Sequence, residues 1–227
     1  MLLYKNFPLK SFHTFSISNI IAKKIFIVHL LEELKQVYNE CIVNNLPFVI
    51  LGEGSNTLFI ENYLGIVIIN KVQGLRVLSK KKFWLIHIYS GEKWHNVVKK
   101  TLKIGIYGLE NLAFIPGCVG SSVIQNIGAY GMEIKDICLY VDILYYKNFK
   151  IQRINAKDCQ FNYRYSIFQN KLKKFVIIAV GLGLKKKWVP NLSHIVFKNF
   201  NCTNVLPQKI FNFIGVIRKK KYLIIKF

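Results

Sequence analysis

Apolar positions in the first part of the chain follow the spacing of strands and of one helix. Apolar and β-branched residues fill residues 20–28, and one helical face recurs through residues 30–44. Short apolar runs at residues 47–51 and 65–70 predict two more strands. We therefore expect a small unit of three strands and one helix that ends near residue 70.

The rest of the chain mixes both patterns without strict alternation. Residues 94–102 have helical periodicity, and Gly105 follows them as a C-terminal cap. Continuous apolar runs at residues 83–89 and 175–184 predict buried strands. The mixture predicts the α+β class.

A hairpin is expected between these two strands. Its arms are residues 139–146 and 149–154, and its turn is at residues 147–148. Asn155 then caps a short helix through Asp158.

Residues 115–131, IPGCVGSSVIQNIGAYG, carry no charge in a protein of net charge +22. We interpret this segment as a loop. Glycine lets the main chain approach a ligand closely, so an anion here would be held by backbone amides and small side chains. The pyrophosphate of a dinucleotide is the leading candidate.

A second segment, residues 47–59, points to the same chemistry. An apolar strand leads into Gly52, Glu53, Gly54, Ser55 and Asn56, and α/β folds place phosphate groups where a strand ends in such a turn. The spacing is not the Rossmann fingerprint. Either segment alone is more often a tight surface turn, but the two together favour a nucleotide.

Charge and composition narrow the alternatives. The 33 lysines and arginines against 11 acids raise nucleic acid as a partner, but they fall in short scattered clusters that are typical of a solvated surface. We therefore expect no nucleic-acid partner. The five cysteines form no CxxC pair and the five histidines no HxxxH pair, so no metal site is expected. No segment predicts membrane insertion or a signal peptide, which favours the cytoplasm.

Arg164 lies in a mostly apolar stretch, residues 161–168. A guanidinium can hold a carboxylate through a reaction, because it stays protonated and offers a rigid fork of donors. An ion pair with Glu110, Glu133 or Asp158 is an equally good explanation.

Five segments, in order, resemble the UDP-N-acetylenolpyruvoylglucosamine reductase family. They are LKSFHTF (9–15), LGEGSNTLF (51–59), GLENLAFIPGCVGSSVIQNIGAYG (108–131), FNYRYSIF (161–168) and AVGLGL (179–184). The resemblance implies a two-subdomain FAD-binding fold of the PCMH or vanillyl-alcohol-oxidase type, with subdomains at residues 1–70 and 71–218.

The resemblance also implies a reaction. NADPH reduces FAD, which reduces UDP-N-acetylglucosamine enolpyruvate to UDP-N-acetylmuramate for peptidoglycan. Arg164 falls on the active-site arginine of the family. The FAD-binding residues it implies are Gly52, Glu53, Gly54, Ser55, Asn56, Pro116, Gly117, Gly120, Ser121, Ser122, Asn126, Gly128 and Ala129.

Four departures qualify this expectation. The family's Gly-Ser-Phe-Phe serine, its proton donor, and its C-terminal glutamate have no counterpart here, and residues 219–227 diverge where the substrate domain would begin. His194 stands in place of a substrate-contacting tyrosine. We expect a truncated reductase, completed by a separate C-terminal fragment; the alternatives are a non-catalytic flavin-binding remnant and a basic nucleic-acid-binding protein.

Overall fold

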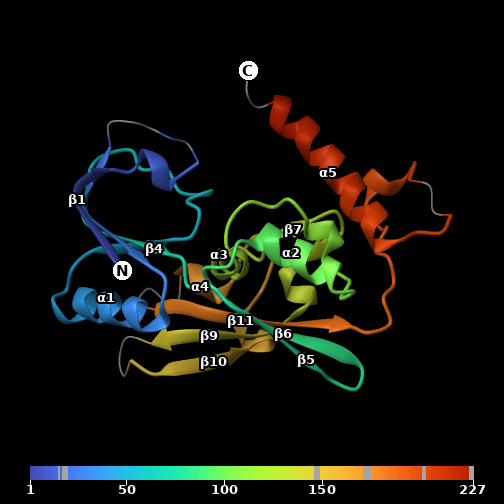
Figure 1. The fold of residues 1–227 in the computed structure, drawn as a ribbon, viewed down its shortest axis with the longest axis horizontal. Helices are drawn as coiled ribbons and strands as arrows, with labels where there is room; N and C mark the ends of the chain where they lie inside the picture. Colours follow the sequence, from blue (N-terminus) through green and yellow to red (C-terminus); the bar gives the residue numbers. More distant parts are fainter. Residues whose placement is uncertain (15, 17–19, 146–148, 171–174, 201–202, 225–227) are drawn as a thin grey trace.

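The computed structural model describes residues 1–14, 16, 20–145, 149–170, 175–200 and 203–224. Two sheets form the framework, with helices between and above them (Figure 1). The first sheet uses strands that lie before residue 71, and the second uses strands that lie after it. The boundary between subdomains at residue 70 stays a prediction.

The first sheet has the strand order β1-β2-β4-β3. Strands β2 (Ile21–Val28), β4 (Tyr63–Asn70) and β3 (Phe48–Leu51) are parallel, and β1 (Leu2–Pro8) pairs antiparallel to β2 at the edge. Helix α1 (Leu31–Val43) forms the crossover from β2 to β3, which lies parallel to it on the other side of β4. Strand β3 therefore delivers residues 52–56 at its carboxyl end.

Helix α1 packs where the two sheets meet. Its buried face includes Leu34 and Tyr38, both fully buried, which belong to one apolar cluster with Phe26 of the first sheet and Val176 and Ile178 of the second. Removing such side chains from water is the main driving force for joining the sheets.

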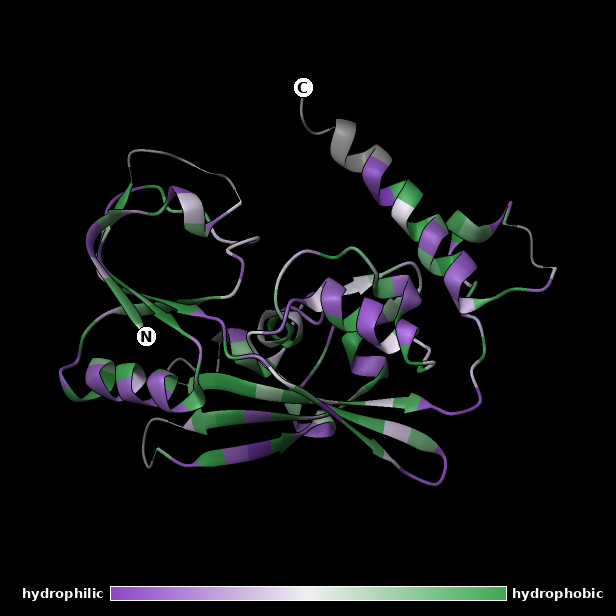
Figure 2. Ribbon diagram, viewed as in Figure 1, coloured by the Kyte–Doolittle hydropathy of each residue, from purple (hydrophilic) through white to green (hydrophobic). Residues whose placement is uncertain are grey.

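The second sheet is antiparallel throughout. Its strand order is β10 (Ile151–Asn155), β9 (Cys138–Tyr145), β11 (Phe175–Lys185), β6 (Phe83–Tyr89) and β5 (Leu75–Ser79). Helices α2 (Trp94–Lys103) and α3 (Val119–Ile124) lie over one face of it (Figure 1). Strand β11 is hydrophobic along most of its length (Figure 2), as its position between two neighbours requires.

Helix α2 begins and ends through identifiable bonds. Trp94 is 1% exposed, and its indole Nε1 donates to the Leu112 carbonyl at 2.8 Å. At the other end Gly105 has φ +76°, and the amides of Gly105 and Ile106 donate to the carbonyls of Leu102 and Thr101. This is the double-bonded glycine cap that the sequence predicts.

Most predicted elements are confirmed within a few residues, and four expectations change. Residues 115–131 are not a loop, because they contain α3 and strand β7 (Gly128–Ala129), which pairs with β8 (Met132–Glu133). Asn155 precedes the 3-10 helix η4 (Ala156–Cys159) without a side-chain capping bond. Strands β1 and β5 and helix α5 (Pro207–Ile224) were not predicted. Helix α5 extends through residues 219–224 of the predicted tail.

Short elements complete the chain: α4 (Ile167–Asn170) and the 3-10 helices η1 (Lys10–Phe12), η2 (Glu110–Leu112), η3 (Ile134–Asp136) and η5 (Ile195–Phe197). The arms of the predicted hairpin are β9 and β10, whereas its turn at residues 147–148 lies outside the described residues. Within the described ranges, no helix has the length and apolarity needed to cross a membrane.

Candidate functional site

The two glycine segments, far apart in the chain, lie against each other. The Glu53 Oε2 atom accepts a hydrogen bond from the Gly117 amide at 2.9 Å, and Lys93 Nζ lies 2.8 Å from Glu53 Oε1. Partial burial acts to raise the pKa of Glu53, but the bonds from Lys93 and Gly117 outweigh it and lower that pKa. Glu53 is therefore an ionised clamp between the segments.

Glycine is required where these backbones meet. A Cβ atom on Gly52 would lie 2.7 Å from Cys118 Sγ, and one on Gly120 would lie 2.7 Å from Ser90 Cβ. A Cβ on Gly117, which has φ +108°, would sit 3.1 Å from Ser121 Oγ and 3.2 Å from Ser55 Oγ. The Gly117 position is thus a small notch flanked by two hydroxyl groups.

Gly54 is held from the other direction. It has φ +59°, and a Cβ there would lie 2.3 Å from the Phe12 carbonyl oxygen. Its own carbonyl accepts the Thr14 amide at 3.3 Å. The N-terminal segment therefore fixes the shape of the 52–56 turn.

Backbone amides of the two segments are used differently. Those of residues 117–122 all donate to protein oxygens, which belong to Glu53, Ser121, Glu92, Ser90 and Cys118. Among the described residues, the amides of Gly54, Ser55 and Asn56 donate to no protein group. The donors available to an anion therefore lie on the 54–56 turn, and residues 117–122 form the wall behind it.

A cavity of about 110 Å³ lies behind this wall. It is lined by Gly52, Cys118, Gly120 and Ser121 together with Asn70 and Ser90. Asn70 Nδ2 donates to Ser90 Oγ at 2.7 Å. The sequence interpretation missed Lys93, Asn70 and Ser90. Asn70 is the last residue of one apolar strand run and Ser90 follows the end of another, which is the signal that locates them.

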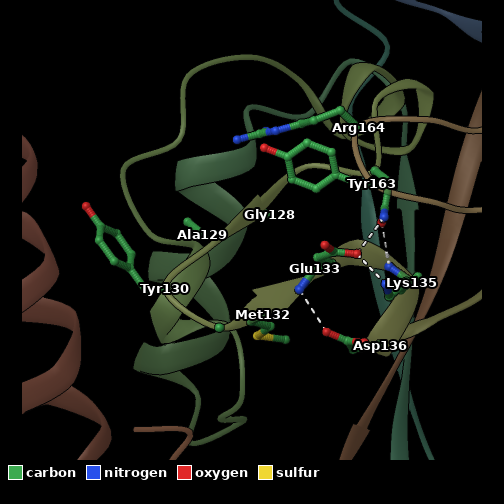
Figure 3. Close-up of a pocket in the computed structure, with 11 residues that line it drawn as sticks. Gly128, Ala129, Tyr130, Met132, Glu133, Lys135, Asp136, Tyr163 and Arg164 are labelled. Atoms are coloured by element: carbon green, nitrogen blue, oxygen red, sulfur yellow. Dashed lines mark hydrogen bonds and ion pairs between the residues drawn. The ribbon is translucent and has the colours of Figure 1, made fainter. Parts of the chain in front are cut away.

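Gly128, Ala129 and Arg164 lie around a larger cavity of about 370 Å³ (Figure 3). Its other lining residues include Tyr163, Glu133, Lys135 and Asn126. Arg164 is exposed, has φ +52°, and sits in a tight turn whose ends bond to each other at Asn162 and Tyr165. The structure thus brings Arg164 beside the carboxyl-terminal end of the 115–131 segment.

The ion-pair explanation for Arg164 is wrong for the described part of the chain, where its guanidinium pairs with no acid. Glu110 is 3% exposed and accepts the Gly108 amide at 2.9 Å. Glu133 pairs with Lys135 at 2.7 Å. Arg164 therefore remains free to bind an external carboxylate.

Two predicted site residues are engaged inside the protein. Ser122 is 2% exposed, and its hydroxyl donates to the Val119 carbonyl at 2.7 Å. Asn126 is 1% exposed, and its side chain bonds to Glu133, to the Asn162 carbonyl and to the Lys135 amide. Their side chains fix the geometry of the site. Asn56 and Pro116, in contrast, are exposed at its surface.

His194 also lies near this region. Its ring meets Tyr130 edge-on with centroids 5.5 Å apart, and its Nδ1 accepts the Val196 amide at 3.1 Å. The Arg218 guanidinium lies 5.5 Å from the same Tyr130 ring. Tyr130 therefore links the second glycine segment to η5 and α5.

The four described cysteines are free thiols. Burial raises the pKa of the Cys118 thiol to about 11, so it stays protonated near neutral pH. Cys202 lies outside the described residues.

Comparison with known families identifies the cofactor class. A family model described as FAD binding domain matches residues 22–154, more than half of the chain. This chain belongs to the FAD-binding domain family. The match contains every predicted FAD-binding residue but not Arg164.

The resemblance expected from the sequence is also confirmed. The chain is 52% identical over 214 residues to the UDP-N-acetylenolpyruvoylglucosamine reductase of Buchnera aphidicola from Acyrthosiphon pisum, covering 94% of this chain and 60% of that relative. It is 44% identical to the Escherichia coli K12 enzyme of the same name, and the match covers 95% of this chain and 63% of that relative. The chain thus spans about three fifths of the length of these curated relatives.

Solved structures confirm the α+β FAD-binding fold. The reductase from Thermus caldophilus aligns with TM-score 0.65 at 19% identity, covering 95% of this chain and 68% of that one. A solvent-stable cholesterol oxidase aligns with TM-score 0.60 at 12% identity, and the alignment covers 81% of this chain and 38% of the oxidase.

FAD fits the residues that are present. The unused amides of Gly54, Ser55 and Asn56 and the Ser55 hydroxyl beside Gly117 offer uncharged donors in one place, which suits a pyrophosphate. The Ser121 hydroxyl instead donates to the Cys118 carbonyl at 2.7 Å.

Proposed function

We propose that this chain is the FAD-binding part of a cytoplasmic UDP-N-acetylenolpyruvoylglucosamine reductase of peptidoglycan synthesis. The observation that carries the proposal is the Glu53–Gly117 bond, which brings the unused amides of residues 54–56 beside the Gly117 notch. The named relatives, at 44% to 52% identity, give the substrate class.

The cofactor would be held mainly by backbone. Amides of Gly54, Ser55 and Asn56 and the hydroxyl of Ser55 would bind the pyrophosphate, and Gly117, which has no side chain, would let it approach. Gly52 and Gly120 contribute indirectly, because they let Cys118 and Ser90 pack against the backbone of the site. Gly128 and Ala129 form the wall toward Arg164. When bound, FAD supplies hydride transfer between NADPH and the enolpyruvyl double bond.

Arg164 would act on the substrate. Its guanidinium is exposed at the 370 Å³ cavity and pairs with no described acid, so it is available to bind the enolpyruvyl carboxylate. Negative charge grows on that group when hydride adds to the double bond. A fixed cation at that point stabilises the charge as it develops.

The final proton must come from another group. The 227 residues contain no Gly-Ser-Phe-Phe sequence, and the resemblance assigns the proton donor to that serine. A separate C-terminal fragment would supply it. Without the fragment, the reductase would turn over at least about 100-fold more slowly. The alternative is a non-catalytic flavin-binding remnant.

The test is to purify the chain, add FAD, and measure flavin binding and NADPH oxidation with and without UDP-N-acetylglucosamine enolpyruvate. Bound FAD with substrate-dependent oxidation supports the reductase. Bound FAD without it supports the remnant, and restored oxidation on adding a C-terminal fragment would return the assignment to the reductase. Folded protein that binds no FAD contradicts both.

A further inference from the structure

Arg164 and Glu133 line the same cavity, yet they do not pair. Glu133 is close enough for the positive charge of Arg164 to lower its pKa. A free carboxylate at such a distance would compete with any substrate carboxylate for the guanidinium. Something must therefore keep Glu133 away.

Two neighbours occupy the Glu133 carboxylate. Lys135 Nζ lies 2.7 Å from its Oε2 atom, and Asn126 Nδ2 donates to the same atom at 2.8 Å. The Lys135 bond is the largest influence on the pKa of Glu133, which is lowered, and it raises the pKa of Lys135 in turn. Figure 3 shows Glu133 turned toward Lys135, while the Arg164 side chain extends away from that pair.

The two neighbours differ in how firmly they are fixed. Asn126 is 1% exposed and also bonds to the Asn162 carbonyl at 2.9 Å, two residues before Arg164. The Lys135 side chain is 44% exposed and the Glu133 side chain 26% exposed. Lys135 is thus the member that can be changed without disturbing the core.

We propose that Lys135 is a positioning residue, which holds the Glu133 carboxylate and so leaves Arg164 available to the substrate carboxylate. The inference rests on the proposed function, because it takes the ligand of Arg164 to be that carboxylate. Lys135 need not touch the substrate to act in this way.

The expected change in substrate affinity follows from competition between Glu133 and the substrate carboxylate for Arg164. If Lys135 is removed and Glu133 turns to Arg164, the apparent affinity falls by the fraction of Arg164 that becomes paired. An exposed ion pair of ordinary strength would raise the apparent Kd about two- to six-fold.

The experiment measures the Kd of UDP-N-acetylglucosamine enolpyruvate for the FAD-loaded chain by calorimetry, in wild type, Lys135→Met and Lys135→Met/Glu133→Gln. Lys81→Met is the matched control, because it removes one exposed lysine from the β5–β6 turn. In parallel, the Arg164 Nε–H resonance reports whether the guanidinium gains a carboxylate partner, with no ligand needed.

We expect weaker binding and a shifted Arg164 resonance in Lys135→Met, with both restored in the double variant and unchanged in Lys81→Met. An unshifted resonance in Lys135→Met overturns the inference, as does a shift that Glu133→Gln does not reverse. If wild type does not bind the probe, the proposed role of Arg164 as the carboxylate ligand of this chain fails, and the resonance still decides whether Lys135 controls Glu133.

Discussion

The Glu53 carboxylate and the Gly117 amide, 64 residues apart in the chain, are joined by a hydrogen bond of 2.9 Å. Replacing Glu53 with alanine should leave Gly117 and Lys93 without this partner. We expect a loss of about 1.5–3 kcal/mol in the free energy of unfolding, measured in urea, together with weaker FAD binding. Glu61→Ala, at an exposed acid, is the control, and equal losses in both variants would refute the clamp.

Acid should weaken the same clamp. The pKa of Glu53 is lowered in the folded chain, so its contribution is complete above the ordinary value of 4.5 and is lost as pH falls through the folded value. FAD release measured by fluorescence should rise below pH 4.5 in wild type. Glu53→Gln should lack this acid-dependent part of FAD release. If FAD release from the variant depends on pH as it does in wild type, the titration of Glu53 is not its cause.

Two glycines separate backbone strain from cofactor contact. Gly117 and Gly105 both have positive φ, but a Cβ on Gly117 meets two serine hydroxyls, whereas one on Gly105 finds only Tyr107 Oη, at 3.9 Å. Both alanine variants should lose about 1–2 kcal/mol of stability from strain. Only Gly117→Ala should also weaken FAD binding, by about ten-fold or more, because the notch is filled. If the two variants bind FAD with similar affinity, the FAD does not contact Gly117.

Arg164 should matter for the ligand and not for the fold. It is exposed and pairs with no described acid, so Arg164→Ala should change stability by no more than about 0.5 kcal/mol. The affinity of the Arg164→Ala variant for UDP-N-acetylglucosamine enolpyruvate should fall about 10- to 100-fold relative to wild type. Arg164→Lys keeps the charge but not the fork, and should recover only part of this loss. Arg76→Ala, which removes an exposed arginine from β5, is the control for loss of one positive charge. An equal loss of ligand affinity in this variant would mean that net charge, and not a contact with Arg164, determines binding.

Local periodicity predicted the elements that have a strong one-sided pattern. Helices α1 and α2 and strands β6 and β11 fall within two residues of expectation. Strand β1 was missed because six of its seven residues are exposed, so no alternation marks it. Helix α3 was missed because Gly120 and two serines suggest a loop, whereas Gly120 is there to let the helix approach Ser90.

The candidate site was predicted in its residue types more than in its contacts. The two glycine segments and Arg164 could be found from composition alone. The role of Lys93 could not, because nothing in the sequence near Lys93 shows that Glu53 lies 2.8 Å away. The choice between a free and a paired Arg164 also depended on contacts, since it required knowing that Glu133 is already bonded to Lys135 and Asn126.

The sequence by itself determined the α+β class, the uncharged glycine segments and the FAD-binding resemblance, because these depend on local periodicity and on which residue types occur. Only the tertiary structure decided which amides an anion can use. The amides of Gly117, Val119 and Gly120 donate to oxygens of residues distant in the chain, and those of residues 118, 121 and 122 donate within their own segment, while the amides of residues 54–56 donate to no described protein group. A backbone donor is available only when folding supplies it no internal acceptor, and that is settled by packing between segments far apart in the chain.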